Sequence, residues 1–292
     1  MAHHGELLQG VFEGEDGRLH RGLISLPLAV QQSMVTFWPG EQGDIHTRPA
    51  GRRKAARAAA LTLKYLGFSN AGGDLTIESD IPVGHGYGSS TADVIAAIRA
   101  AAAATGATVR RSTVCRLAVE AEGASDAIAY GDQAVLFAHR EGRILEHFGG
   151  EYPPLLVVGF RTDGARQINT LSLPRARYDP LEIEKFRTLR GLASHAVRHQ
   201  DPRLIGSVAT ASARISQRHL AKSHFEAVVE LAGSHGASGV QVAHSGTLMG
   251  VLFDADEGGV AARAAALAET LRQAGFEGIV TFAVNVDGAF LQ

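Results

Sequence analysis

The chain has 292 residues, 45% of them hydrophobic, and its 28 basic side chains nearly balance its 30 acidic ones. The net charge of −2 gives no electrostatic reason to expect nucleic acid or an anionic membrane as a partner. The one cysteine, Cys115, excludes an internal disulfide framework and a cysteine-built zinc site, and its apolar neighbours indicate a core thiol. No signal peptide opens the chain and no apolar run reaches the roughly 18 residues of a membrane span, so we expect a cytoplasmic protein.

The first half of the chain mixes short strands with helices. Helices are expected at 50–66, 91–104 and 112–122, where apolar residues recur at helical spacing and Ser112 is placed to cap the third. Strands are expected at 22–38 (one or two strands), 74–78, 133–137 and 143–148, the last two forming a hairpin.

The second half follows a break near residue 150, where paired glycines and paired prolines punctuate the chain. Strands are expected at 155–160, 239–243, 247–253 and 279–286. Helices are expected at 181–200, 202–218, 223–234 and 259–274. This order predicts an α+β fold in two lobes, residues 1–150 and 151–292, with helices packed on a mostly antiparallel sheet.

The segment 82–91 carries the strongest functional signal. Three alternate-position glycines are followed by two serines and an alanine-rich helix. Glycine lets the backbone approach a ligand closely, and the helix start offers unpaired N–H groups at the positive end of its dipole. This pattern favours a phosphate site, and the alternative is a glycine-rich turn in which Ser89 or Ser90 is an ordinary N-cap.

Two common phosphate loops do not fit this segment. A Walker loop needs a lysine after its second glycine, and no lysine lies between Lys64 and Lys185. A dinucleotide fingerprint needs a glycine where Ser89 stands. The remaining pattern resembles the ATP loop of the GHMP kinases, with Tyr87 where those kinases usually have leucine. The resemblance assigns ATP binding to Pro82, Gly84, His85, Gly86, Tyr87, Gly88, Ser89, Ser90 and Thr91.

The same resemblance implies the two-lobed GHMP kinase fold. In that fold the N-terminal ATP-binding lobe is ribosomal-S5-domain-2-like and the C-terminal lobe is ferredoxin-like.

A second motif, Gly-Glu-Leu-Leu-Gln-Gly, occupies residues 5–10. Taken alone it could be a strand edge or turn with solvated polar tips. It resembles the opening of the L-threonine kinase branch of the GHMP kinases, which implies that Glu6 and Gln9 line an amino-acid pocket. Glu6 could pair with an α-ammonium group, and Gln9 could bind the carboxylate or hydroxyl. The adjacent His3 and His4 point to opposite sides of a strand and are not expected to chelate one metal.

A third motif lies in the segment 239–253, which on its own reads as a simple hairpin. Its Ala-His-Ser-Gly-Thr turn resembles the C-terminal glycine-rich motif of the family and is typical of the threonine kinase branch. The resemblance implies that the turn packs beside the phosphate loop. Ser245, Gly246 and Thr247 would then offer donors to substrate or phosphate, with His244 supporting the turn rather than acting as a base.

Phosphoryl transfer also needs a divalent cation, and Mg²⁺ prefers oxygen ligands. Ser90 at the helix start is the natural hydroxyl ligand. The family places a magnesium-binding glutamate at the end of the next helix, where the threonine kinases have Glu-Pro-Thr-Asp and this chain has one extra residue. We favour Glu122 over Glu120 as that ligand. Asp126 is either the catalytic base, as in mevalonate kinase and galactokinase relatives, or a loop residue that caps a turn.

These features predict an ATP- and Mg²⁺-dependent kinase that phosphorylates the hydroxyl of a small hydroxy amino acid, with L-threonine favoured. One alternative is a homoserine kinase or another GHMP kinase that acts on a hydroxy amino acid or in secondary metabolism. The other is a catalytically silent ATP-binding module. No nucleic acid or membrane partner is expected, and the sequence leaves a homodimer open.

Overall fold

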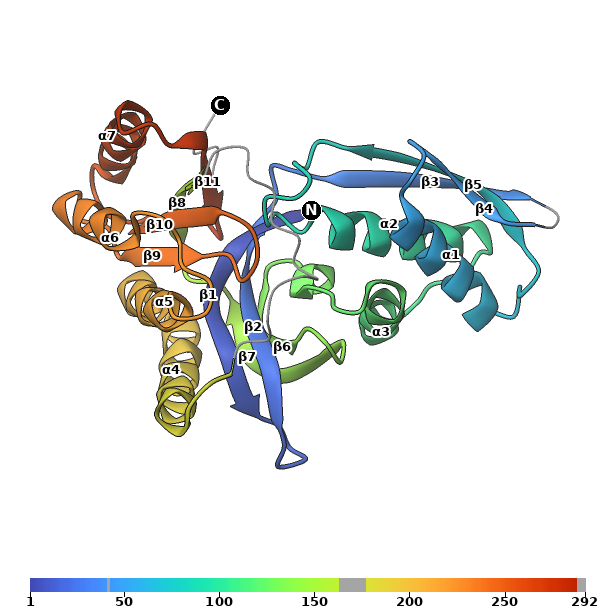
Figure 1. The fold of residues 1–292 in the computed structure, drawn as a ribbon, viewed down its shortest axis with the longest axis horizontal. Coiled ribbons are helices and arrows are strands. Elements are labelled where there is room, and N and C mark those ends of the chain that lie inside the picture. Colours follow the sequence, from blue (N-terminus) through green and yellow to red (C-terminus); the bar gives the residue numbers. More distant parts are fainter. Residues whose placement is uncertain (41–42, 163–176, 288–292) are drawn as a thin grey trace.

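The computed structural model describes residues 1–40, 43–162 and 177–287 (Figure 1). Eight strands form one sheet in the order β11-β8-β10-β9-β1-β2-β6-β7, and neighbouring strands run antiparallel throughout. The strands are β1 (Ala2–Glu13), β2 (Leu19–Leu28), β6 (Gln133–Ala138), β7 (Arg143–Glu151), β8 (Leu155–Arg161), β9 (Gly239–Val242), β10 (Leu248–Asp254) and β11 (Glu277–Val284).

A second, smaller sheet lies beside the N-terminal helices, in the order β3-β5-β4. Its strands are β3 (Ser33–Gly40), β4 (Ile45–Arg48) and β5 (Gly72–Ser79), with β4 parallel to β5. The helices are α1 (Arg53–Tyr65), α2 (Ser89–Ala104), α3 (Arg111–Glu122), the 3₁₀ turn η1 (Ala127–Tyr130), α4 (Pro180–Arg198), α5 (Pro202–Ser216), α6 (Phe225–Ser234) and α7 (Val260–Gln273). Figure 1 shows α4–α7 on one side of the large sheet and α1–α3 with the small sheet on the other.

The large sheet is covered on both faces, which explains why β1 is buried along nearly its whole length. One core joins β1 and β2 to α2, α3, α4 and α5, and includes Leu7, Leu8, Ile24 and Phe186. A second core packs α6 and α7 against β8–β11, and a third fills the space between the small sheet, α1 and α2. Polar residues in β1 are therefore held inside the protein, where each needs a hydrogen-bond partner.

The two halves of the chain each contribute four adjacent strands, and they join where β1 meets β9 at Glu6 and Val242. The first four-strand block ends with β7 at Glu151, next to the predicted break. The sheet itself runs through the join without interruption, so the division into 1–150 and 151–292 stays a prediction.

Several sequence predictions need correction. Arg110, not Ser112, is the N-cap of α3, and its side chain makes no cap hydrogen bond. Residues 2–13 form a central strand rather than an edge with solvated tips, because α4 and α5 cover it. The short strand β4 and the turn η1 were not predicted, since four-residue elements carry little periodicity. The mixed fold and the antiparallel large sheet agree with the prediction. No helix in the described ranges is both long and apolar enough to cross a bilayer.

Candidate active site

The glycine segment before α2 forms an open loop with an uncapped helix start. Gly84, Gly86 and Gly88 have φ values of 84°, 101° and 71°, in the left-handed region that favours glycine. Gly88 is the N-cap of α2 and no side chain caps the helix, so neither Ser89 nor Ser90 is an ordinary N-cap. The first N–H groups of α2 are thus available to an anion.

The C-terminal turn packs directly on this loop. A Cβ atom at Gly86 would lie 2.3 Å from the Ser245 carbonyl oxygen, and one at Gly246 would lie 2.1 Å from the His85 carbonyl oxygen. The Thr247 N–H donates to that same His85 oxygen at 3.2 Å. Glycine is required at both positions because no side chain fits between the two backbones.

A cavity of about 420 Å³ opens where the loop, the turn and the N-terminal strands meet. Most of the predicted site residues line it: Gln9, Gly84, Gly86, Gly88, Ser89, Ser90, Thr91, Glu122, Asp126, His244, Ser245 and Gly246. The predicted residues that do not line it are Glu6, Pro82, His85, Tyr87 and Thr247. Of these, Tyr87 is buried against the ring of His4, and His85 lies 3.3 Å from the guanidinium of Arg161.

Glu122 receives hydrogen bonds from the first turn of α2. The Ser90 hydroxyl donates to one carboxylate oxygen at 2.9 Å, and the Thr91 hydroxyl donates to the other at 2.9 Å. Lys54 Nζ lies 3.8 Å from the same carboxylate. Burial raises the pKa of Glu122 to about 7, and the neighbouring Asp126 charge acts in the same direction. Glu120 is exposed and lies outside the cavity lining, so Glu122 is the glutamate that lies beside Ser90.

Asp126 forms a buried ion pair with His3 from β1. The distance from His3 Nε2 to Asp126 Oδ2 is 3.0 Å, and Thr91 Oγ1 lies 3.4 Å from the same oxygen. Burial alone would keep His3 neutral, but the charge and hydrogen bond of Asp126 outweigh it and raise the pKa of His3 to about 9. Burial likewise opposes ionisation of Asp126, and His3 holds the pKa of that carboxyl below its usual range. The Asp126 side chain makes no cap hydrogen bond to η1, which removes the turn-capping interpretation.

Glu6 lies behind the cavity wall, in a contact with His244. The His244 backbone N–H donates to one Glu6 oxygen, and the His244 ring nitrogen Nδ1 lies 2.8 Å from the other. His3 Nδ1 is 3.7 Å from a Glu6 carboxylate oxygen. The potential ligand atoms of His3, Glu6 and Asp126 all lie within 4.8 Å of one another, but the raised pKa keeps the His3 ring protonated, and a protonated ring is not a metal ligand. The predicted pairing of Glu6 with an α-ammonium group would require the His244 contacts to break, while Gln9 lines the cavity and its contact with substrate stays a prediction.

Several cavity residues carried no sequence motif. They are Arg21, Leu23, Lys54, His139, Arg140, Tyr178, Ser216, His219 and Leu220. Lys54 lies in the basic run 52–54, and its Nζ is 3.8 Å from the Glu122 carboxylate. Arg52 of the same run donates to the buried Asp93 at 2.9 Å. The others come from elements far apart in the sequence, and only the tertiary fold brings them together.

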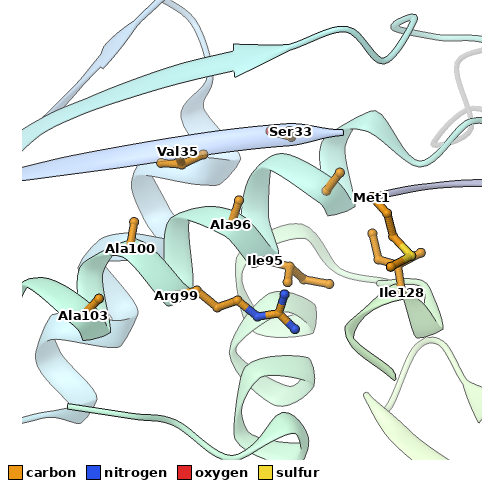
Figure 2. Close-up of a pocket in the computed structure, with 10 residues that line it drawn as sticks. Met1, Ser33, Val35, Ile95, Ala96, Arg99, Ala100, Ala103 and Ile128 are labelled. Atoms are coloured by element: carbon orange, nitrogen blue, oxygen red, sulfur yellow. The ribbon is translucent and has the colours of Figure 1, made fainter. Parts of the chain in front are cut away.

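A second cavity, of about 400 Å³, lies between α2 and β3 (Figure 2). Its lining is mostly alanine and other apolar side chains, and Arg99 is its charged member, donating to the Ala129 carbonyl oxygen at 3.4 Å. None of the described residues that line it carries a side-chain carboxylate. Phosphoryl transfer needs a metal-binding carboxylate, so the cavity at the glycine loop is the candidate active site.

Known proteins resemble the chain in both sequence and fold. Residues 53–139 match the family model described as GHMP kinases N terminal domain. The chain is 30% identical over 273 residues to an L-threonine kinase of Salmonella typhimurium, covering 91% of this chain and 85% of that enzyme. A homoserine kinase from Cytophaga hutchinsonii has the same fold, with a TM-score of 0.68 at 16% identity over 98% of this chain and 93% of that one. A mevalonate kinase from L. major gives 0.61 at 14% identity, over 99% and 97% of the two chains.

The chain belongs to the GHMP kinase family. It is an ATP-dependent phosphotransferase that acts on a small molecule, as the sequence motifs predicted.

Proposed function

We propose that the protein transfers the γ-phosphoryl group of ATP to the side-chain hydroxyl of L-threonine, giving O-phospho-L-threonine and ADP. The observation that carries this proposal is the meeting of three features in one cavity: the uncapped start of α2, the Ser90–Glu122 pair and Asp126. The relatives named L-threonine kinase in Salmonella typhimurium and Citrobacter freundii support threonine as the acceptor.

The phosphate end of the cavity is built from backbone donors. The N–H groups at the start of α2 and the glycine loop would hold the β- and γ-phosphates, with the helix dipole favouring their negative charge. The packed turn at Ser245 and Gly246 would close the loop over the nucleotide. Lys54, beside Glu122, would add a positive charge at this end.

A divalent cation fits the oxygen donors at the start of α2. The Ser90 hydroxyl and the Glu122 carboxylate, 2.9 Å apart, would hold Mg²⁺, a cation that prefers oxygen ligands. When bound it would neutralise charge on the β- and γ-phosphate oxygens.

In this proposal Asp126 would receive the acceptor. Because His3 keeps it ionised, it would accept a hydrogen bond from the threonine hydroxyl and orient that oxygen toward phosphorus. In the transfer the hydroxyl oxygen bonds to the γ-phosphorus, the bond to the β–γ bridging oxygen breaks, and the hydroxyl proton passes to Asp126 or to a phosphate oxygen. We also propose that the protein acts in the cytoplasm, where ATP is available as the donor. The homodimer stays a prediction.

A coupled ADP-release assay tests the proposal, run over L-threonine, L-serine, L-homoserine and mevalonate with mass analysis of the product. We expect phosphothreonine as the main product. Homoserine preferred over threonine would move the enzyme to the homoserine kinase alternative, and ATP binding without turnover of any alcohol would favour the silent module.

The Asp126→Asn variant separates the roles of this carboxylate. If Asp126 takes the proton, turnover falls by roughly 10²–10⁴-fold while ATP binding stays intact. A loss of only a few fold would indicate that phosphate receives the proton directly.

A further inference from the structure

The side chain of Arg161 connects the large sheet to the glycine loop. Arg161 is the last residue of β8, and its Nη1 lies 3.3 Å from Nε2 of His85, which stands between Gly84 and Gly86 in the loop. A guanidinium can only donate hydrogen bonds, so Nε2 of His85 accepts this one and the ring proton is on Nδ1. Burial lowers the pKa of His85, and the positive charge of Arg161 acts in the same direction. The contact therefore joins a charged donor to a neutral imidazole.

Two features of β11 hold the guanidinium of Arg161 in place. Glu277 is opposite Arg161 in the strand pairing, and one of its carboxylate oxygens lies 3.3 Å from Nη2. The register of β11 then shifts between Glu277 and Val280, where Gly278 has a φ of 61°. A Cβ atom at Gly278 would lie 2.6 Å from Arg161 Nε, so the arginine side chain occupies the space that a larger residue would need. Both ends of the guanidinium thus have a defined neighbour, Glu277 on one side and His85 on the other.

Backbone hydrogen bonds join the same elements. The Thr162 N–H donates to the Thr247 carbonyl oxygen at 3.0 Å, and the Thr247 N–H donates to the His85 carbonyl oxygen at 3.2 Å. The turn therefore holds the backbone of His85, while Arg161 holds its ring. The end of β8 contacts the loop by both routes.

The glycine loop needs such contacts because its glycines restrict the backbone little. Gly84 and Gly86, on either side of His85, have φ values of 84° and 101°, which glycine adopts as readily as negative values. His85 itself is only 8% exposed, so its ring can serve as an anchor for the segment. A loop that is already ordered loses less conformational entropy when a ligand binds, and its affinity for the ligand is higher.

We infer that Arg161 is a positioning residue for the nucleotide, holding the glycine loop through His85 in the shape that binds the phosphates. Arg161 is not among the described residues that line the cavity, so it acts through the loop rather than by touching the nucleotide. The inference rests on the phosphate site of the proposed function and does not depend on which alcohol is the acceptor.

The test is a double-mutant cycle read by calorimetry. The probe is adenylyl imidodiphosphate with Mg²⁺, a non-hydrolysable ATP analogue whose binding requires no acceptor. The variants are Arg161→Met, His85→Leu and the two combined. Arg263→Met is the matched control, because Arg263 is a partly buried arginine that also pairs with a glutamate, Glu257, and is not among the cavity residues.

Arg161→Met should weaken binding of the analogue by about 10-fold, the loss expected for a hydrogen bond from a charged donor. The combined variant should bind within about 2-fold of His85→Leu, because Arg161 has no separate route to the nucleotide. Arg263→Met should match the wild type. In activity assays the loss should be seen as a higher KM for ATP, with kcat at saturating ATP within about 3-fold of the wild type.

Two results would overturn the inference. Losses that add in the combined variant would mean that the charge of Arg161 attracts the phosphates directly. An Arg161→Met variant with lower thermal stability but unchanged affinity for the analogue would show that the residue only stabilises the fold.

A further variant keeps the test decisive if Arg161→Met does not fold. His85→Gln retains a side-chain oxygen that can accept from Arg161, so it should bind the analogue more tightly than His85→Leu, and equal affinities would count against the inference. If the wild type binds no analogue at all, the proposed phosphate site itself fails. If the wild type binds it and Arg161→Met binds it equally well, only the role of Arg161 fails.

Discussion

The ion pair between His3 and Asp126 should make the stability of the protein depend on pH in the alkaline range. Both side chains are buried, their charged atoms are 3.0 Å apart, and the pKa of His3 is raised from 6.5 to about 9. Replacing His3 with glutamine keeps a polar side chain of similar size but removes the charge. Asp126 is then left buried without its cation, which is costly.

The magnitude follows from the protons bound in each state. Between pH 6.5 and about 9 the folded protein keeps the proton on His3 while the unfolded chain loses it. The stabilisation from His3 is therefore complete below pH 6.5 and disappears as the pH rises through 9. At roughly 1.4 kcal/mol per pH unit, that interval corresponds to about 3 kcal/mol at most. Asp126, whose pKa is lowered, loses its own contribution as the pH falls through the acid range.

The assay is chemical unfolding of the wild type and His3→Gln between pH 6 and 9.5. We expect the wild type to be more stable at pH 6.5 and the difference to shrink steadily toward pH 9. His139→Gln is the control above about pH 7.5, because there His139 is neutral in both the folded and the unfolded protein and its difference from the wild type should be flat. A His3→Gln difference that does not change with pH would refute the ion pair.

Two other predictions concern the phosphate end of the site. Glu122→Gln should lower kcat by at least about 10²-fold, since it removes the carboxylate that we propose as the Mg²⁺ ligand. Glu120→Gln should stay within about 2-fold of the wild type, and equal effects of the two variants in Mg²⁺ titrations of activity would contradict the assignment of Glu122. Gly86→Ala should destabilise the protein by about 1–3 kcal/mol more than Gly67→Ala, because both have positive φ but only Gly86 has a backbone oxygen 2.3 Å from the new Cβ. Thermal unfolding measures this difference, and similar melting temperatures for the two variants would argue against the tight contact between loop and turn.

The sequence was most informative where function depends on the backbone. Alternate glycines before an alanine-rich helix can be recognised locally, and the structure places them at an uncapped helix start. The helices and most strands were also predicted within a few residues, because their apolar periodicity is strong.

Side-chain partners across the fold were beyond the reach of sequence patterns. His3 and Asp126 are more than 120 residues apart, and nothing local indicates that β1 brings one to the other. Glu6 is buried against His244 because β1 pairs with β9 beside it. The local motif at residues 5–10 does not indicate that pairing, so it could not show that Glu6 contacts His244. Arg21 and Arg140 lacked any motif for the same reason, since they line one cavity only in the folded protein, where β2 pairs with β6.

The most direct measurement is a crystal structure with Mg²⁺, a non-hydrolysable ATP analogue and L-threonine. We predict the triphosphate at the start of α2, the metal between Ser90 and Glu122, and the threonine hydroxyl against Asp126. A nucleotide bound elsewhere, with the start of α2 unoccupied, would contradict the proposed site.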